Sequence, residues 1–93
     1  MDKICRRHIV FEGWVQGVGF RYRAKHAAEL MHCTGWVKNE YDGSVIMEIQ
    51  GKPDDIKEVL LGIQRGRYIR IEKMNVTAIP VVQGERGFQT RYY

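Results

Sequence analysis

The stretch from Gly13 to Arg21, GWVQGVGFR, joins two segments whose apolar residues follow different periods. Residues 5–15, which overlap the start of this stretch, alternate apolar side chains on one face, which is typical of a β-strand. After it, apolar side chains from Phe20 to Met31 recur at helical spacing and form the single stripe of an amphipathic helix. The stretch therefore predicts a strand, a glycine-rich loop and a helix in immediate succession, with an arginine at the start of the helix.

The remaining segments complete a β-α-β-β-α-β order. A hairpin over residues 35–51 turns at an Asp-Gly pair, and Pro53 opens a second helix that Gly66 is expected to end. Gly35 is expected to end the first helical segment. The strand predicted over residues 68–79 changes the parity of its apolar positions, which predicts a β-bulge near Glu72 or Lys73. Residues 87–93 predict a short last strand.

This order predicts an α+β fold, in which an antiparallel sheet is covered on one face by two helices. A length of 93 residues predicts a single domain over residues 1–93. The apolar fraction of 44% allows a packed core and excludes a disordered chain. Trp36 is expected to pack on the first helix, and the alternative is that it helps to wall the site.

Composition also restricts the cellular setting. The N-terminus has no apolar segment of the kind found in signal peptides, and no apolar run approaches the length of a membrane span. We therefore expect a cytoplasmic protein, without a membrane partner, whose two cysteines are reduced. The net charge of +4 tolerates an anionic ligand but does not require nucleic acid. Neither cysteine has metal-ligand spacing to a histidine, so no metal site is expected.

The glycine loop has two interpretations from its residues alone. Glycines that adopt positive φ turn successive N–H groups inward, and a helix N-terminus adds positive partial charge, so the loop and Arg21 would suit a phosphate group. The same glycines would equally serve a tight turn, with Arg21 on the surface of the helix. A Walker A loop is excluded because no Gly-Lys-Ser/Thr follows, and a dinucleotide fingerprint is excluded because Tyr22 stands where its third glycine belongs.

Two long motifs resemble the acylphosphatase family. GWVQGVGFR, Gly13 to Arg21, is similar to the first signature of that family, and GWVKNEYDGSVIMEIQG, Gly35 to Gly51, is similar to the second. The closing GFQTRYY also resembles the last strand of the family. The resemblance covers essentially the whole chain, and it implies the ferredoxin-like βαββαβ sandwich that agrees with the element order above.

The resemblance also implies an activity, the hydrolysis of acyl phosphates to a carboxylate and inorganic phosphate, without metal or organic cofactor. Arg21 would bind the phosphate, and Asn39 would orient the attacking water. The rest of the phosphate site would be formed by the backbone amides of loop residues Gln16, Gly17, Val18, Gly19 and Phe20. The implied partners are a small acyl phosphate substrate and its phosphate product, and a monomer is expected.

The alternative function is a non-catalytic anion- or RNA-binding ferredoxin-like module. RNA-binding sheets of this fold carry aromatic residues on the third strand, and the segment SVIMEIQ at residues 44–50 has none. Retention of both Arg21 and Asn39 favours the enzyme over a module that only binds anions.

Overall fold

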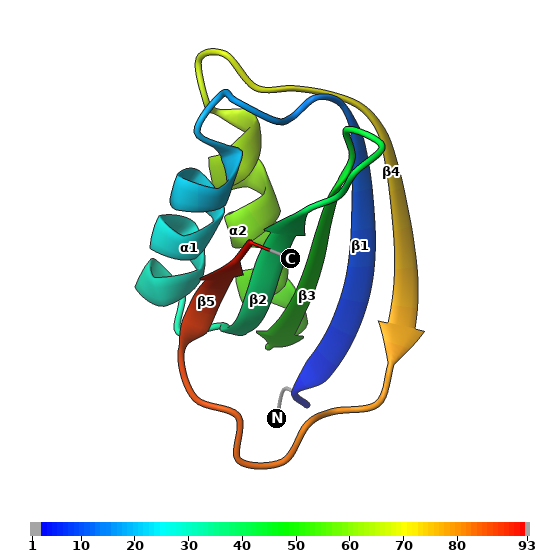
Figure 1. Cartoon of the computed structure of the whole chain (residues 1–93). Helices are drawn as coiled ribbons and strands as arrows, with labels where there is room; N and C mark the ends of the chain where they lie inside the picture. The colour runs from blue at the N-terminus through cyan, green and yellow to red at the C-terminus, as the bar shows by residue number, and fades with distance from the viewer. Residues whose placement is uncertain (1–2, 93) are drawn as a thin grey trace.

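The computed structural model describes residues 3–92 and shows a five-stranded sheet with two helices on one face (Figure 1). Its elements are β1 (Cys5–Trp14), α1 (Phe20–Leu30), β2 (Thr34–Asn39), β3 (Val45–Gly51), α2 (Pro53–Gln64), β4 (Arg70–Ile79) and β5 (Phe88–Arg91). The strands lie in the order β4-β1-β3-β2-β5. This arrangement confirms the α+β, ferredoxin-like class.

The last strand makes the sheet mixed rather than wholly antiparallel. β1 pairs antiparallel with β3 and β4, and β2 pairs antiparallel with β3, whereas β5 pairs parallel with β2. The parallel pairing follows from the β4–β5 connection. After β4 the chain crosses the lower end of the sheet, and β5 then runs along the opposite edge in the same direction as β2 (Figure 1). Tyr93, at the end of the predicted last strand, lies outside the described residues.

The β-bulge predicted in β4 is present at Glu72. Glu12 faces Lys73 while Gly13 faces Ile71, so Glu72 is the extra residue. Gly13 adopts a φ of 127°, and a Cβ built on it would lie 2.4 Å from the backbone oxygen of Arg70. A glycine is therefore required where β1 passes the bulge and enters the glycine loop.

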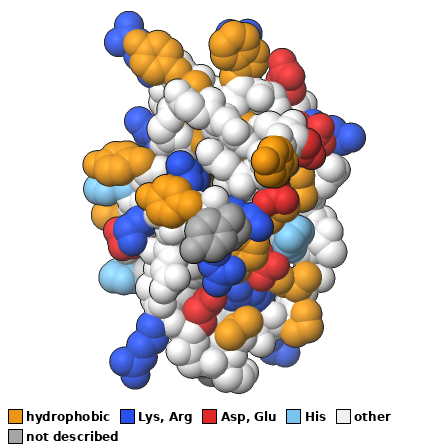
Figure 2. Space-filling view, in the orientation of Figure 1, with side chains coloured by type: hydrophobic (Ala, Val, Ile, Leu, Met, Phe, Trp, Pro, Cys, Tyr) orange, Lys and Arg blue, Asp and Glu red, His pale blue; other side chains and the backbone are white. Residues whose placement is uncertain are grey.

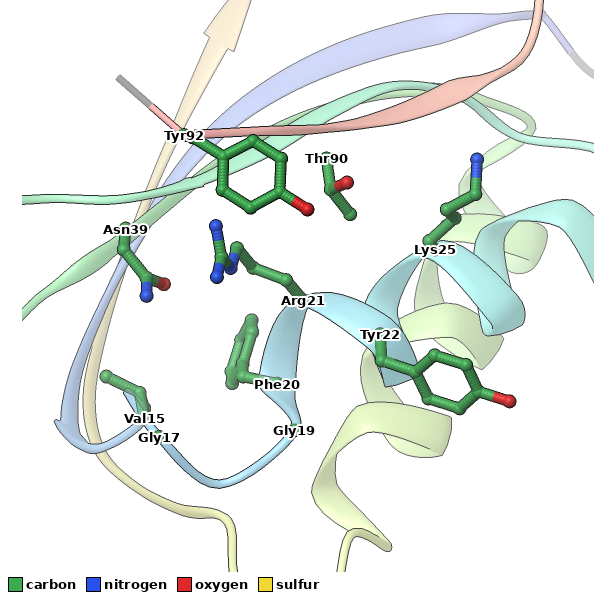
Figure 3. Close-up of a pocket in the computed structure, with 10 residues that line it drawn as sticks. All are labelled: Val15, Gly17, Gly19, Phe20, Arg21, Tyr22, Lys25, Asn39, Thr90 and Tyr92. Atoms are coloured by element: carbon green, nitrogen blue, oxygen red, sulfur yellow. The ribbon is translucent and has the colours of Figure 1, made fainter.

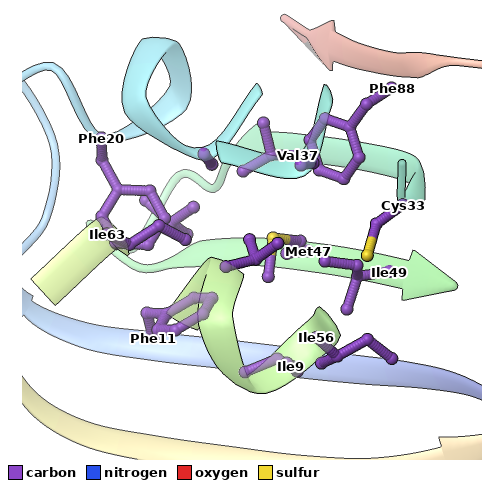
Figure 4. Packing of buried hydrophobic residues seen from close by; sticks show 14 of the residues in the cluster. Ile9, Phe11, Phe20, Cys33, Val37, Met47, Ile49, Ile56, Ile63 and Phe88 are labelled. Atoms are coloured by element: carbon purple, nitrogen blue, oxygen red, sulfur yellow. The ribbon is translucent and has the colours of Figure 1, made fainter. Parts of the chain in front are cut away.

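The core lies between the helices and the inner face of the sheet (Figure 4). The alternation read from β1 is confirmed, because Ile9 and Phe11 are fully buried. α1 presents its stripe to the same core, and the ring centroids of Phe11 and Phe20 lie 4.8 Å apart. Phe20 is thus anchored in the core at the first residue of α1, which holds the end of the glycine loop in place.

Gly35 does not end the first helix, contrary to prediction. α1 ends at Leu30, the turn runs through His32 at a φ of 58°, and Gly35 lies inside β2. A Cβ at Gly35 would lie 1.9 Å from the backbone oxygen of Glu48. The glycine therefore serves the close pairing of β2 with β3.

The second helix follows its sequence signals closely. α2 begins at Pro53 with Asp54 and Asp55 in its first turn, where the helix dipole favours negative charge. Its last turn closes with the amide of Gly66 donating to the carbonyl of Ile63. Gly62, a poor helix former, lies where a Cβ would approach Ala27 of α1 to 3.4 Å, so its small size serves the contact between the helices.

A polar cluster on the sheet face opposite the helices holds the β4–β5 connection. Arg6 is only 3% exposed and donates hydrogen bonds to Glu48, Gln50 and Glu85. Burial opposes the charged form, but the hydrogen bonds with Glu85 and Glu48 outweigh it and raise the pKa of Arg6. Glu85 belongs to the β4–β5 connection and also accepts a hydrogen bond from the hydroxyl of Thr34. The cluster therefore ties this connection to β1, β2 and β3, just before the chain enters β5.

Trp36 lies on this outer face, so the expectation that it packs on α1 is wrong. Along β2 the residues facing the helices are Gly35 and Val37, and Trp36 alternates to the other side. There the guanidinium carbon of Arg91 lies 4.6 Å from the centroid of the Trp36 ring, a cation–π contact between β5 and β2.

Candidate functional site

The glycine loop, residues 15–19, leads directly into the N-terminus of α1, which has no side-chain cap. Gly17 and Gly19 adopt φ values of 72° and 79°, in the left-handed region that favours glycine. Gly19 is the N-cap of α1 and supplies no side-chain cap, while its carbonyl accepts the first helical bond from Arg23. No acidic residue occupies the first turn. The first amides of α1 therefore lack intrahelical acceptors, and no carboxylate of that turn competes with an incoming anion.

The side chain of Gln16 fastens the glycine loop to the β2–β3 hairpin. Its Nε2 donates to the backbone oxygens of Glu40 at 2.7 Å and Ser44 at 2.8 Å. The hairpin turn is itself held by Asp42, which accepts hydrogen bonds from the amide and the hydroxyl of Ser44. These hydrogen bonds lower the pKa of Asp42. Gln16 thus couples the loop to the end of β2, where Asn39 lies.

A cavity of about 330 Å³ opens between the glycine loop, α1 and the ends of β2 and β5 (Figure 3). Arg21 and Asn39 both line it, so the structure brings together the two residues that the motifs singled out. Gly17, Gly19 and Phe20 line it as well. The other lining residues are Val15, Tyr22, Lys25, Thr90 and Tyr92.

Arg21 is held from the side of β5. Its Nη1 donates to the backbone oxygen of Arg91 at 3.2 Å, and its guanidinium carbon lies 4.7 Å from the centroid of the Tyr92 ring. Lys25, one turn further along α1, donates to the backbone oxygen of Phe88 at 2.8 Å. These two hydrogen bonds join β5 to α1, so the position of the Arg21 guanidinium depends on how the last strand is docked.

Asn39 ends β2 with an unpartnered acceptor. It shares the helix-facing side of β2 with Val37, and its amide projects into the cavity near Arg21 (Figure 3). Its Oδ1 is buried, and it is the one buried side-chain oxygen or nitrogen within residues 3–92 that has no hydrogen-bond partner. Buried acceptors are normally satisfied, so this oxygen calls for a donor from water or a ligand.

Two of the predicted loop residues lie outside the cavity lining. The side chain of Gln16 is engaged by the hairpin, and Val18 lines a neighbouring hollow and packs partly against the core. Four lining residues beyond the first motif were missed by motif reading: Tyr22, Lys25, Thr90 and Tyr92. Phe88, Thr90 and Tyr92 alternate along the last segment and so share one face of a strand, but this pattern does not show that the face closes the cavity.

The histidines and cysteines lie outside this cavity. His8 contacts Glu48 at 2.9 Å on the outer face of the sheet. Both cysteines are free, and burial, with smaller contributions from Asp55 and Cys5, raises the pKa of Cys33 to about 11. Within residues 3–92, no three histidine, cysteine or acidic side chains are grouped as metal ligands would be. Neither helix has the length and apolar character to cross a membrane.

The sequence and the structure of this chain both resemble those of known proteins. The family model described as "Acylphosphatase" matches residues 7–90. A protein named "Acylphosphatase" from Geobacillus kaustophilus is 40% identical over 88 residues, which cover 94% of each chain. The crystal structure of acylphosphatase from Bacillus subtilis superposes with a TM-score of 0.86 at 29% identity, over 95% of this chain and 99% of that one.

A larger protein contains the same fold as one of its parts. Full-length HypF, in its phosphate- and nucleotide-bound crystal form, matches with a TM-score of 0.85 at 26% identity, over 98% of this chain but 12% of that one. The relative from Geobacillus kaustophilus, in contrast, matches along nearly its whole length. Together with the family model, these matches show that the chain belongs to the acylphosphatase family, hydrolases of acyl phosphates.

Proposed function

We propose that the cavity beside the glycine loop binds the phosphate end of an acyl phosphate and that Asn39 presents the attacking water. The observation that carries the proposal is the buried, unpartnered Oδ1 of Asn39 in the same cavity as the guanidinium of Arg21. The two residues supply what the reaction needs, a cation for the phosphoryl oxygens and an acceptor that orients a water molecule.

The phosphate binds where the donors converge. Arg21 offers a planar pair of N–H groups, and the first amides of α1 and the loop amides from Gln16 to Phe20 complete the set. With Nη1 already donating to the carbonyl of Arg91, the guanidinium keeps its remaining N–H groups for the ligand. The Tyr92 ring limits its movement from one side. Arg21 is therefore preorganised, and little ordering cost falls on the bound state.

The chemistry that follows needs no general acid. The oxygen of a water molecule, held through a hydrogen bond to Asn39 Oδ1, attacks phosphorus opposite the acyl oxygen. The bond between phosphorus and that oxygen breaks, and the electron pair leaves with the carboxylate, which is a weak base. Because the Asn39 amide is not basic near pH 7, the proton of the water passes to a phosphate oxygen of the substrate. Inorganic phosphate and a carboxylate are released.

The role of Arg21 is tested with Arg21→Ala and Arg21→Lys. Benzoyl phosphate hydrolysis is followed without added metal, and inorganic phosphate is titrated as a competitive inhibitor. We expect Arg21→Ala to lose about 10²–10³ in rate and to weaken phosphate inhibition, since one preorganised donor to transition-state charge is removed. Arg21→Lys keeps the charge but not the fork, so it should recover only part of the loss. Equal inhibition of Arg21→Ala and wild type by phosphate would contradict this role.

A further inference from the structure

A second hollow, of about 420 Å³, adjoins the cavity that contains Arg21. It lies between α1 and the connection from α2 to β4, and Gly19 and Tyr22 line both spaces. A phosphate bound beside Gly19 therefore has, directly next to it, a space large enough for the organic part of its substrate. The phosphate site itself does not select among acyl groups, so any selection must come from such an adjoining surface.

The second hollow is positively charged and lacks acidic residues. Arg23, His26 and Arg67 contribute to its lining, and no aspartate or glutamate does so. Within residues 3–92, neither arginine forms an ion pair. Arg23 donates to the backbone oxygen of Gly62 at 3.3 Å, and the guanidinium carbon of Arg67 lies 5.7 Å from the centroid of the Tyr68 ring. Both arginines are exposed residues, and their remaining N–H groups are available to an anion.

Two exposed aromatic rings flank these arginines. Tyr22 is 76% exposed and Tyr68 is 68% exposed. The Tyr22 ring stacks on His26 with centroids 6.2 Å apart and points away from Arg21 (Figure 3). Basic and large apolar side chains protrude together at the end of the molecule that carries these loops (Figure 2). Exposed rings grouped around a hollow are a common feature of ligand-binding surfaces.

We propose that this hollow receives the acyl group and that Arg23 and Arg67 favour acyl phosphates whose organic part carries a second anionic group. The inference rests on the phosphate site proposed above, because that site fixes the end from which the acyl group extends. Rings and arginines in alternation also suit single-stranded nucleic acid. The lining shared with the phosphate cavity favours the substrate, since it places the hollow within reach of a group attached to the bound phosphate.

The test compares substrates that differ only in a distal charge. One pair is 4-carboxybenzoyl phosphate and its methyl ester, and a longer pair is 4-(2-carboxyethyl)benzoyl phosphate and its methyl ester. For each protein the ratio of kcat/KM between charged and neutral substrate is measured. The change of this ratio from wild type to variant cancels the intrinsic reactivity of the two anhydrides and any general effect of charge on phosphate binding.

We expect Arg23→Gln and Arg67→Gln each to lower the ratio by about two- to fivefold, the range typical of an exposed ion pair. The double variant should lower it further, and hydrolysis of the neutral esters should stay within about twofold of wild type. Lys57→Gln is the matched control, because it removes one positive charge from an exposed position of α2 outside both spaces. Its ratio should not change.

Three outcomes would overturn the proposal. One is an unchanged ratio in the double variant for both substrate lengths, and another is an equal loss on charged and neutral substrates. The third is binding of a short oligouridylate that weakens in the arginine variants while the ratio stays constant, which would assign the surface to nucleic acid. Failure of the proposed phosphate site is distinguishable from failure of this inference. It would appear as unchanged hydrolysis of a neutral substrate by Arg21→Ala, and the ratio of kcat/KM between charged and neutral substrates could still be measured in the Arg23 and Arg67 variants.

Discussion

Replacing Asn39 with alanine should separate activity from stability. The Oδ1 of Asn39 is buried without a hydrogen-bond partner, so the side chain contributes no protein hydrogen bond to the folded state through that atom. A buried acceptor without a partner costs about 1–3 kcal/mol, less whatever a bound water returns. Asn39→Ala keeps the Cβ and removes this acceptor. We therefore expect the free energy of unfolding to stay the same or to rise by up to about 1 kcal/mol.

The same change should remove most of the activity. An acceptor that positions the attacking water acts in the transition state, and loss of one preorganised polar group of this kind typically costs about 2.7–4 kcal/mol, or roughly 10²–10³ in kcat. Because we propose that Arg21 and the amides, and not Asn39, hold the phosphate, inhibition by inorganic phosphate should change by less than about threefold. A variant that is as stable as wild type, binds phosphate and turns over slowly is the expected result.

The assay combines benzoyl phosphate turnover, phosphate inhibition and thermal unfolding on the same preparations. Lys38→Ala is the control, since Lys38 neighbours Asn39 on β2 but faces the opposite side of the sheet, where it pairs with Glu40. Its kcat should remain within twofold of wild type. Unchanged kcat in Asn39→Ala would refute the water-positioning role. A fall in melting temperature of more than about 5 °C, which corresponds to about 1 kcal/mol in a domain of this size, would refute the structural argument.

Three further predictions concern the scaffold. Gln16→Ala removes two hydrogen bonds, so unfolding in urea should show a loss of about 1–3 kcal/mol, with a raised KM because the glycine loop is no longer fastened to the hairpin. Gly35→Ala should lower the free energy of unfolding by about 3 kcal/mol or more, since its Cβ would lie 1.9 Å from a backbone oxygen. At Gly19 an added Cβ meets open space, so Gly19→Ala should lower it by only about 1–2 kcal/mol, which is typical of left-handed backbone. Comparable losses for the two variants in thermal unfolding would contradict this ranking. Burial would raise the pKa of Glu48, but hydrogen bonds with His8 and Arg6 hold it below its ordinary value of 4.5. The ionised carboxylate therefore contributes to the free energy of unfolding above pH 4.5, and this contribution should be lost as the pH falls through the lowered pKa. Glu48→Gln should lose less stability than wild type between pH 5 and 3, measured by urea unfolding.

The glycine loop shows how far motif reading extends. The residues around Arg21 indicated an anion site, and the cavity beside them contains Arg21 and Asn39 together. The same reading treated Gln16 only as a source of a backbone amide. Its side chain instead bonds to two carbonyls of a hairpin that is more than twenty residues away in the chain. A partner at that distance leaves no periodic signal in the sequence around Gln16.

The sequence by itself determined the local elements. Alternation and helical spacing are properties of neighbouring residues, so β1, the stripe of α1, the hairpin and the bulge at Glu72 could all be read from short windows. The parity change in β4 was sufficient to locate the bulge because a single extra residue moves every later side chain to the other face.

Only the tertiary structure decided how distant segments meet. The parallel docking of β5 on β2 and the contacts of Arg91 and Tyr92 with Arg21 depend on which sheet edge is free once four strands have paired. From the sequence alone, Gly35 is a plausible helix terminator. The close approach of Glu48, which is the reason for a glycine at this position, arises only when β3 is in register beside β2. Such contacts are selected by the packing of the whole chain, and for that reason no short stretch of sequence contains them.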